Sequence, residues 1–182
     1  MKKLLIIAVA MAAVAANAAT FSWKTSATGK IYGADSTTLL ASGTAYLFDS
    51  GKVSQATVLA AFDAGTALST LAYADSTSVS SGAIAEKSFD VPAGYASGDA
   101  FAGYFAIVVD DSIYIGPETS AATPATGNKS MSFNAKASSQ AAALDISGGY
   151  SGAGWYTAVP EPTSGLLMLL GMAGLALRRR RA

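Results

Sequence analysis

The strongest strand pattern in this chain reads Phe101-Ala102-Gly103-Tyr104-Phe105-Ala106-Ile107-Val108-Val109, then Asp110-Asp111, then Ser112-Ile113-Tyr114-Ile115. Alternate side chains of a strand face opposite sides, so Phe101, Phe105, Ile107 and Val109 share one face, while Tyr104 and Val108 share the other. Apolar residues on both faces predict a strand that is covered on both sides. Asp110-Asp111 is predicted to be a two-residue hairpin loop, because Asp tolerates the positive φ of such turns.

Shorter segments with the same alternation occur on either side of this pair, separated by Gly, Ser, Asp and Pro. One of them is followed by Asp49-Ser50-Gly51, a sequence typical of a turn. The further predicted strands are Phe21 to Lys24, Lys30 to Tyr32, Thr44 to Phe48, Lys129 to Asn134 and Trp155 to Val159.

The segment Ser54 to Asp63 has helical rather than strand spacing. Val58, Leu59 and Phe62 lie on one face of such a helix. The serine that opens the segment is a suitable N-cap, and Gly65 stands where a glycine commonly ends a helix. These features predict one short helix packed against a sheet.

Two other segments are less regular. Ala135 to Leu144 is compatible with a second short helix, and Asp75 to Gly82 is predicted to be a serine-rich loop. The sum of these elements predicts a mainly β domain over residues 19–158, an antiparallel β-sandwich or jelly-roll-like domain with one or two short helices. A signal peptide and a C-terminal membrane helix are expected to flank it.

The first 18 residues have the pattern of a signal peptide. Lys2 and Lys3 precede an apolar run, and Ala16-Asn17-Ala18 supplies the small residues of a cleavage site. Signal peptidase is therefore expected to cleave before Ala19. The alternative, an N-terminal membrane helix, is weaker because the apolar run is short and ends in alanines.

Residues 159–182 have three parts: the motif Val159-Pro160-Glu161-Pro162, an uncharged segment over 163–177, and the basic cluster Arg178-Arg179-Arg180-Arg181. The uncharged segment spans about 22 Å as a helix, which is short for a hydrocarbon core of about 30 Å. Such a helix inserts marginally, and the four arginines are expected to stop its transfer across the membrane.

In this order, the three parts resemble the PEP-CTERM sorting tail of exported proteins in Gram-negative-type bacteria. The resemblance implies recognition by exosortase, a membrane-embedded cysteine protease, with the precursor held transiently in the inner membrane. It also implies a final location at the outer envelope surface or in the extracellular matrix of a biofilm, and exopolysaccharide as a further partner. The alternative is an ordinary anchor in which Pro-Glu-Pro is only a linker.

The chain contains no cysteine and no histidine. This excludes disulfides, zinc sites built from thiolate or imidazole, and catalysis that depends on a histidine or a cysteine. Between residues 20 and 158 there are six lysines and eleven Asp or Glu residues, an excess of negative charge that argues against nucleic-acid binding. No catalytic residue, metal site or cofactor is expected, and the protein is not expected to be an enzyme.

Two weaker patterns leave other roles open. Asp110-Asp111 is the one adjacent carboxylate pair, and with Asp90, Asp99 or Glu118 it would suit calcium or glycosidase chemistry. Several aromatic residues would suit sugar stacking, above all Trp155 and Tyr156; the set is Trp23, Tyr32, Tyr46, Tyr104, Tyr150, Trp155 and Tyr156. The expected function is a sorted envelope or matrix protein with a non-catalytic structural or adhesive domain, and the alternatives are a glycan-binding module and a carboxylate-dependent secreted hydrolase.

Overall fold

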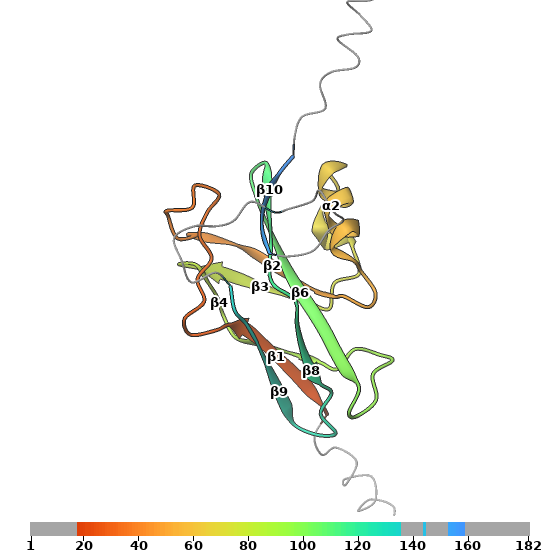
Figure 1. Ribbon diagram of the computed structural model, residues 1–182. Coiled ribbons are helices and arrows are strands. Elements are labelled where there is room, and N and C mark those ends of the chain that lie inside the picture. The colour runs from red at the N-terminus through yellow and green to blue at the C-terminus, as the bar shows by residue number, and fades with distance from the viewer. Residues whose placement is uncertain (1–17, 136–143, 145–152, 159–182) are drawn as a thin grey trace, which may run out of the picture.

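The computed structural model describes residues 18–135, 144 and 153–158, which form a mainly β domain of two sheets (Figure 1). One sheet has three strands in the order β5-β1-β9; the other has seven, in the order β10-β7-β6-β2-β3-β4 with β8 paired to β6. The elements are β1 (Thr20–Thr25), β2 (Ser42–Asp49), α2 (Gln55–Asp63), the 3-10 helix η2 (Leu68–Thr70), β3 (Asp75–Ser80), β4 (Ala83–Ile84), β5 (Lys87–Asp90), β6 (Ala100–Val109), β7 (Ser112–Ile115), β8 (Thr119–Ala122), β9 (Asn128–Phe133) and β10 (Gly154–Thr157).

Strand β6 is the centre of the larger sheet, and the predicted strand and its hairpin are confirmed, although Val108 on the predicted second covered face is exposed. It pairs antiparallel with β2, β7 and β8. Phe105 on one face and Tyr104 on the other are both fully buried, in two separate hydrophobic clusters. The hairpin to β7 turns at Asp110, whose φ of 49° is the positive value expected for this loop.

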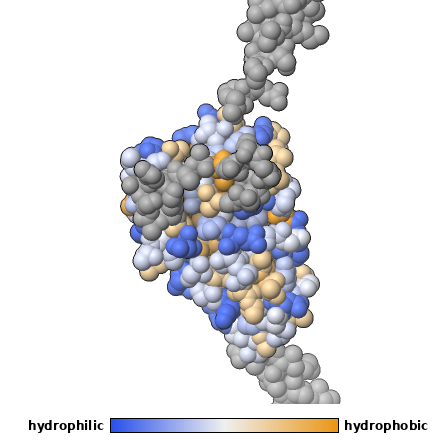
Figure 2. Space-filling view, viewed as in Figure 1, coloured by the Kyte–Doolittle hydropathy of each residue, from blue (hydrophilic) through white to orange (hydrophobic). Residues whose placement is uncertain are grey.

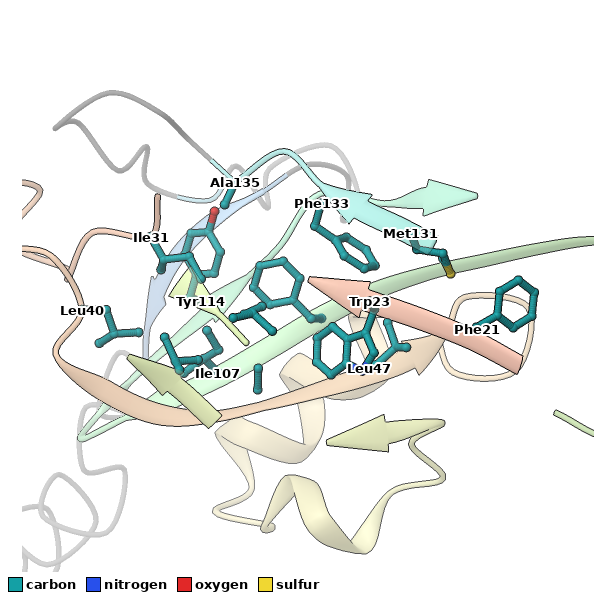
Figure 3. Packing of buried hydrophobic residues seen from close by; sticks show 14 of the residues in the cluster. Phe21, Trp23, Ile31, Leu40, Leu47, Ile107, Tyr114, Met131, Phe133 and Ala135 are labelled. Atoms are coloured by element: carbon teal, nitrogen blue, oxygen red, sulfur yellow. The ribbon is translucent and has the colours of Figure 1, made fainter. Parts of the chain in front are cut away.

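The main core lies where the two sheets face each other (Figure 3). Trp23 from β1 and Phe133 from β9 approach Phe105 from β6, with ring centroids 5.4 to 6.5 Å apart. Two sheets that bury one face each against the other need no disulfide to hold them, because packed apolar area supplies the stability.

The single α-helix among the described residues covers the opposite face of the larger sheet, and its predicted ends are confirmed. The Ser54 side chain accepts a hydrogen bond from the backbone N of Thr57. At the other end, Gly65 has φ of 67°, and the backbone N of Thr66 donates to Ala61 O. This C-terminal hydrogen bond belongs to a glycine-terminated Schellman motif. From this helix, Val58 packs in the same hydrophobic cluster as Tyr104.

The predicted loop Asp75 to Gly82 is wrong, because most of it is strand β3. This strand pairs antiparallel with β2 over six residue pairs, from Ser42 with Ser80 to Leu47 with Asp75. The strand lies between β2 and the two-residue edge strand β4, and among its otherwise polar side chains only Val79 is buried. Ser81 and Gly82 both have positive φ, so they form the turn rather than the whole segment.

Two further expectations need correction. Lys30 to Tyr32 is not a strand; Tyr32 forms only an isolated bridge with Leu39. The sheets are antiparallel apart from one pair, because β9 runs parallel to β1. Of the predicted second helix, residues 136–143 lie outside the described residues.

The two ends of the described domain lie at opposite ends of the structure (Figure 1). Strand β1 begins at the lower end in that view, and β10 ends at the upper end beside α2 and the β6–β7 hairpin. No helix within the described ranges is long and apolar enough to cross a membrane. The predicted signal peptide up to residue 17 and the predicted membrane helix 163–177 lie outside those ranges.

Candidate functional site

A groove with a volume of about 840 Å³ lies on the outer face of the larger sheet, and we call it the hairpin groove. It is bounded by β2, by the end of α2 with η2, by the β6–β7 hairpin and by the end of β10. Its lining residues are Thr44, Tyr46, Phe62, Gly65, Thr66, Ala67, Leu68, Ser69, Val108, Asp110, Asp111, Thr157 and Ala158.

The floor of the groove is a part of the sheet face that α2 leaves uncovered. Thr44 and Tyr46 are adjacent outward positions of β2, and Val108 of β6 is 38% exposed although it belongs to the central strand. The ring of Tyr73, itself 40% exposed, meets the ring of Tyr46 edge-on at 5.3 Å. The floor therefore combines the apolar area of Val108 and Tyr46 with the exposed hydroxyl-bearing residue Thr44.

One wall is held in place by an aromatic pair and a hydrogen bond. Phe62 of α2 meets Tyr156 of β10 edge-on, with ring centroids 6.2 Å apart. The Tyr156 hydroxyl donates to Asp63 Oδ2 at 3.2 Å. Burial, together with this hydrogen bond and the charge of Asp63, raises the pKa of Tyr156. The Schellman turn that follows the helix then presents the exposed Thr66 to the groove.

The opposite rim is acidic. Asp110 and Asp111 are both exposed at the hairpin tip, and neither carboxylate has a hydrogen bond or an ion pair with another described residue. The backbone N of Ala158 donates to Asp111 O at 3.3 Å, so the chain leaves the described domain at this rim. Carboxylates with unused lone pairs are acceptors for the hydroxyl or amine groups of a ligand.

The carboxylates that were candidates for metal or acid–base chemistry do not come together. Asp99 Oδ2 accepts a hydrogen bond from the backbone N of Ala96, as in a turn. Within the described part of the chain, no three Asp or Glu residues are grouped closely enough to hold a metal ion. Asp110-Asp111 therefore lies in the groove without Asp90 or Glu118 beside it.

Three of the six described members of the predicted aromatic platform are buried in the core. Trp23 and Tyr104 are fully buried, and Trp155 is 7% exposed, with its indole N donating to Tyr32 O at 2.7 Å. Tyr46 and Tyr156 are the two half-buried members that contribute to the groove or its wall. Tyr150 lies outside the described residues.

Sequence reasoning missed Tyr73 and the segment over residues 65–69. The sequence pattern assigns Gly65 to the end of the helix, and the stretch Ala67 to Ala74, which includes Tyr73, has no clear periodicity. A usable signal was present in β2, where Thr44 and Tyr46 alternate with buried residues and therefore had to face outward.

The predicted sorting and cleavage residues lie at the margins of the domain. Ala18 is exposed at its start. Ala16, the motif Val159-Pro160-Glu161-Pro162 and the cluster Arg178-Arg179-Arg180-Arg181 lie outside the described residues.

Comparison with protein families finds one match, the PEP-CTERM protein-sorting motif, at residues 158–181. No curated protein and no solved structure gives a significant match to the chain. The motif covers the C-terminal part of the sequence and begins at the residue that is bonded to the hairpin rim.

Proposed function

Since the chain carries a PEP-CTERM protein-sorting motif, we propose that it is an exported envelope or matrix protein whose tail is removed by exosortase. The motif implies export, anchoring in a membrane before processing, and exosortase as the processing enzyme. The precursor is held in the inner membrane by residues 163–177 with the arginine cluster as its stop signal. The released domain goes to the outer envelope surface or the extracellular matrix.

The end of the fold supports cleavage at the motif. The last described strand, β10, ends at Thr157, and the backbone of Ala158 is still bonded to the hairpin. Pro160-Glu161-Pro162 follows after one further residue. A cut at or after the motif therefore removes no strand of the domain, so the product keeps its fold.

The start of the fold supports signal-peptide removal in the same way. Ala19 O accepts a hydrogen bond from the backbone N of Val91, and β1 begins at the next residue. Cleavage after Ala18 therefore leaves a domain whose first residue, Ala19, is hydrogen-bonded to Val91. Signal peptidase and exosortase together yield a mature chain of about residues 19–158.

The proposed role of the released domain is structural or adhesive, without catalysis. The hairpin groove favours a second candidate, binding of a glycan, because it offers a partly apolar floor and free carboxylates at one place. The third alternative, a carboxylate-dependent hydrolase, gains no support, because Asp99 is engaged in a turn and, within the described ranges, no third Asp or Glu is grouped with the hairpin pair.

Replacing Glu161 by Ala in the native host tests the sorting proposal. The motif is expected to be read by exosortase as a unit, so Glu161→Ala should leave uncut precursor in the inner membrane, as should four Arg→Gln changes at residues 178–181. Glu118→Ala, at an exposed loop position, is the matched control and should be processed as the wild type is. Fractionation followed by immunoblotting gives the result. Equal processing of Glu161→Ala and wild type would mean that the tail is an ordinary anchor.

A further inference from the structure

We propose that the hairpin groove is a binding site for a neutral polysaccharide chain, which lies along the floor between η2 and the β6–β7 hairpin. The inference rests on the second candidate role of the domain, glycan binding, and does not depend on how the tail is processed. It adds the class of ligand and the place at which the ligand binds.

Charge decides the class of glycan. Among the described residues, the charged ones that line the groove are Asp110 and Asp111, with no Lys or Arg beside them. Asp63 adds a third negative charge behind the wall, where it accepts a hydrogen bond from Tyr156. An anionic polymer would meet two carboxylates at the rim that no described residue neutralises, and like charges at close range are unfavourable. A neutral chain meets only acceptors for its hydroxyl groups.

The hydrogen-bonding groups of the groove match those of a sugar. Asp110 and Asp111 offer acceptors that no described residue uses, and the hydroxyls of Thr44, Thr66 and Ser69 are exposed around the floor. A pyranose ring carries hydroxyl groups that donate and accept at its edge. A purely apolar ligand, such as an acyl chain, would leave all of these acceptors desolvated and unpaired, which costs free energy.

The floor supplies the apolar surface that a sugar ring needs for its C–H face. The exposed Val108 and the half-buried Tyr46 both line the groove. Tyr73 packs edge-on against Tyr46, which restrains that ring. Fixed aromatic and aliphatic groups lose little conformational entropy on binding, so they are efficient contacts for a flat ring.

The shape of the groove suits a chain rather than a single sugar. Its volume of about 840 Å³ lies within the range of ligand sites in proteins. The groove is partly open to solvent. The face viewed in Figure 2 shows hydrophilic and hydrophobic residues intermixed, with strongly hydrophobic residues only in small spots, so no broad apolar surface there competes as a docking site.

Binding is tested on the full chain, purified in a detergent without a sugar headgroup. The probes are neutral hexasaccharides of glucose, galactose, mannose, xylose and N-acetylglucosamine, with polygalacturonate as the anionic comparison. Isothermal titration calorimetry measures each Kd. At least one neutral hexasaccharide is expected to bind, and polygalacturonate is expected to bind at least tenfold more weakly or not at all.

Variants place the site. Val108→Arg fills the floor with a long side chain and should abolish binding of the neutral hexasaccharide. Leu39→Arg is the matched control, because Leu39 is exposed to a similar extent, 37% against 38%, but does not line the groove. Asp110→Asn with Asp111→Asn keeps the shape of the rim and should weaken binding about tenfold, since hydrogen bonds to charged groups are the stronger ones.

Three outcomes would overturn the inference. If no hexasaccharide binds, glycan binding fails as well as the ligand class. If polygalacturonate binds more tightly than every neutral probe, the domain binds glycan but the assignment to neutral chains is wrong. If Val108→Arg and the double Asp→Asn variant bind as wild type does, while circular dichroism shows both folded, the site lies elsewhere. None of these outcomes bears on exosortase processing, which Glu161→Ala tests separately.

Discussion

Asp75 ties the two sheets together through one carboxylate. Its Oδ2 accepts the indole N–H of Trp23 from β1 at 2.8 Å, and its Oδ1 accepts from Lys87 Nζ of β5 at 2.7 Å. Trp23 itself is fully buried. A buried indole N–H without an acceptor carries a desolvation penalty, so this carboxylate matters more than an exposed ion pair would.

Replacing Asp75 by Ala is therefore expected to lower the free energy of unfolding by about 1.5–3 kcal/mol, the range for a hydrogen bond to a charged group. Asp75→Asn keeps an acceptor for Trp23 and should cost less. Asp90→Ala, at an exposed strand end, should change stability by less than about 0.5 kcal/mol. Urea unfolding of residues 19–158 measures all three. Equal midpoints for Asp75→Ala and Asp90→Ala would show that the carboxylate is dispensable.

Tyr95 gives the stability of the domain a dependence on alkaline pH. Its hydroxyl donates to Asp49 Oδ1 at 2.8 Å. Burial, then this hydrogen bond and the charge of Asp49, raises the pKa of Tyr95 to about 12. An unfolded Tyr titrates near pH 10, so above that pH the unfolded state loses a proton that the folded state retains. Stability should be unaffected by this group below about pH 10 and should fall from there towards pH 12.

The variant Tyr95→Phe isolates that contribution. Its free energy of unfolding should decline less steeply than that of the wild type between about pH 10 and 11.5, because the titrating hydroxyl is gone. Gly51 N still donates to Asp49 Oδ1 in the variant. Guanidinium unfolding at several pH values measures the two slopes. Parallel slopes would mean that Tyr95 titrates alike in the folded and unfolded states.

Neither of these roles could be predicted from the sequence. Asp49 is followed by Ser50-Gly51 and Asp75 by Ser76, so local pattern assigns both to loops. Their carboxylates accept hydrogen bonds from Tyr95 and Trp23, which lie 46 and 52 residues away in the chain. Local sequence contains no information on such distant partners.

At the scale of elements, α2 is held by the caps that its sequence predicts. Ser54→Ala removes the side-chain acceptor of the Thr57 N–H and should destabilise the domain by about 1 kcal/mol. Ser54→Asp retains an acceptor at the N-cap and should stay within a few tenths of a kcal/mol of the wild type. Thermal unfolding followed by circular dichroism compares them. An unchanged midpoint for Ser54→Ala would show that packing alone holds the helix.

The contrast between α2 and β3 shows which elements are predictable. The helix has apolar spacing, an N-cap and a terminating glycine within a dozen residues, so local signals agree. Strand β3 has Val79 as its one buried apolar residue. It is a strand because all six of its residues pair with residues of β2. Pairing of this kind overrides composition, which here favoured a loop.

At the scale of the whole molecule, the sequence predicts the strands better than their arrangement. The mainly β class, the β6–β7 hairpin and the cover on both faces of β6 at Tyr104 and Phe105 are confirmed, whereas Val108 on the second face is exposed. The parallel pairing of β1 with β9 joins segments about a hundred residues apart, and no local periodicity encodes it. The hairpin groove depends on that assembly, since β2, β6, β10 and the end of α2 contribute to it.

The sorting tail is the opposite case. Its three parts are contiguous, so composition and order alone identify it, and the family match at residues 158–181 supports that identification without any knowledge of the fold. In the structure, Ala19 and Ala158 are the first and last described residues with a backbone hydrogen bond to another part of the domain. A processed chain with these ends keeps every described strand of the two sheets.

The most direct measurement of the central claim is the intact mass of the protein recovered from the envelope or matrix of its native host. The expected mass is that of a chain that begins at or near Ala19 and ends close to Pro160-Glu161-Pro162, without residues 163–182. A dominant mass that still includes Arg178 to Ala182 would contradict it.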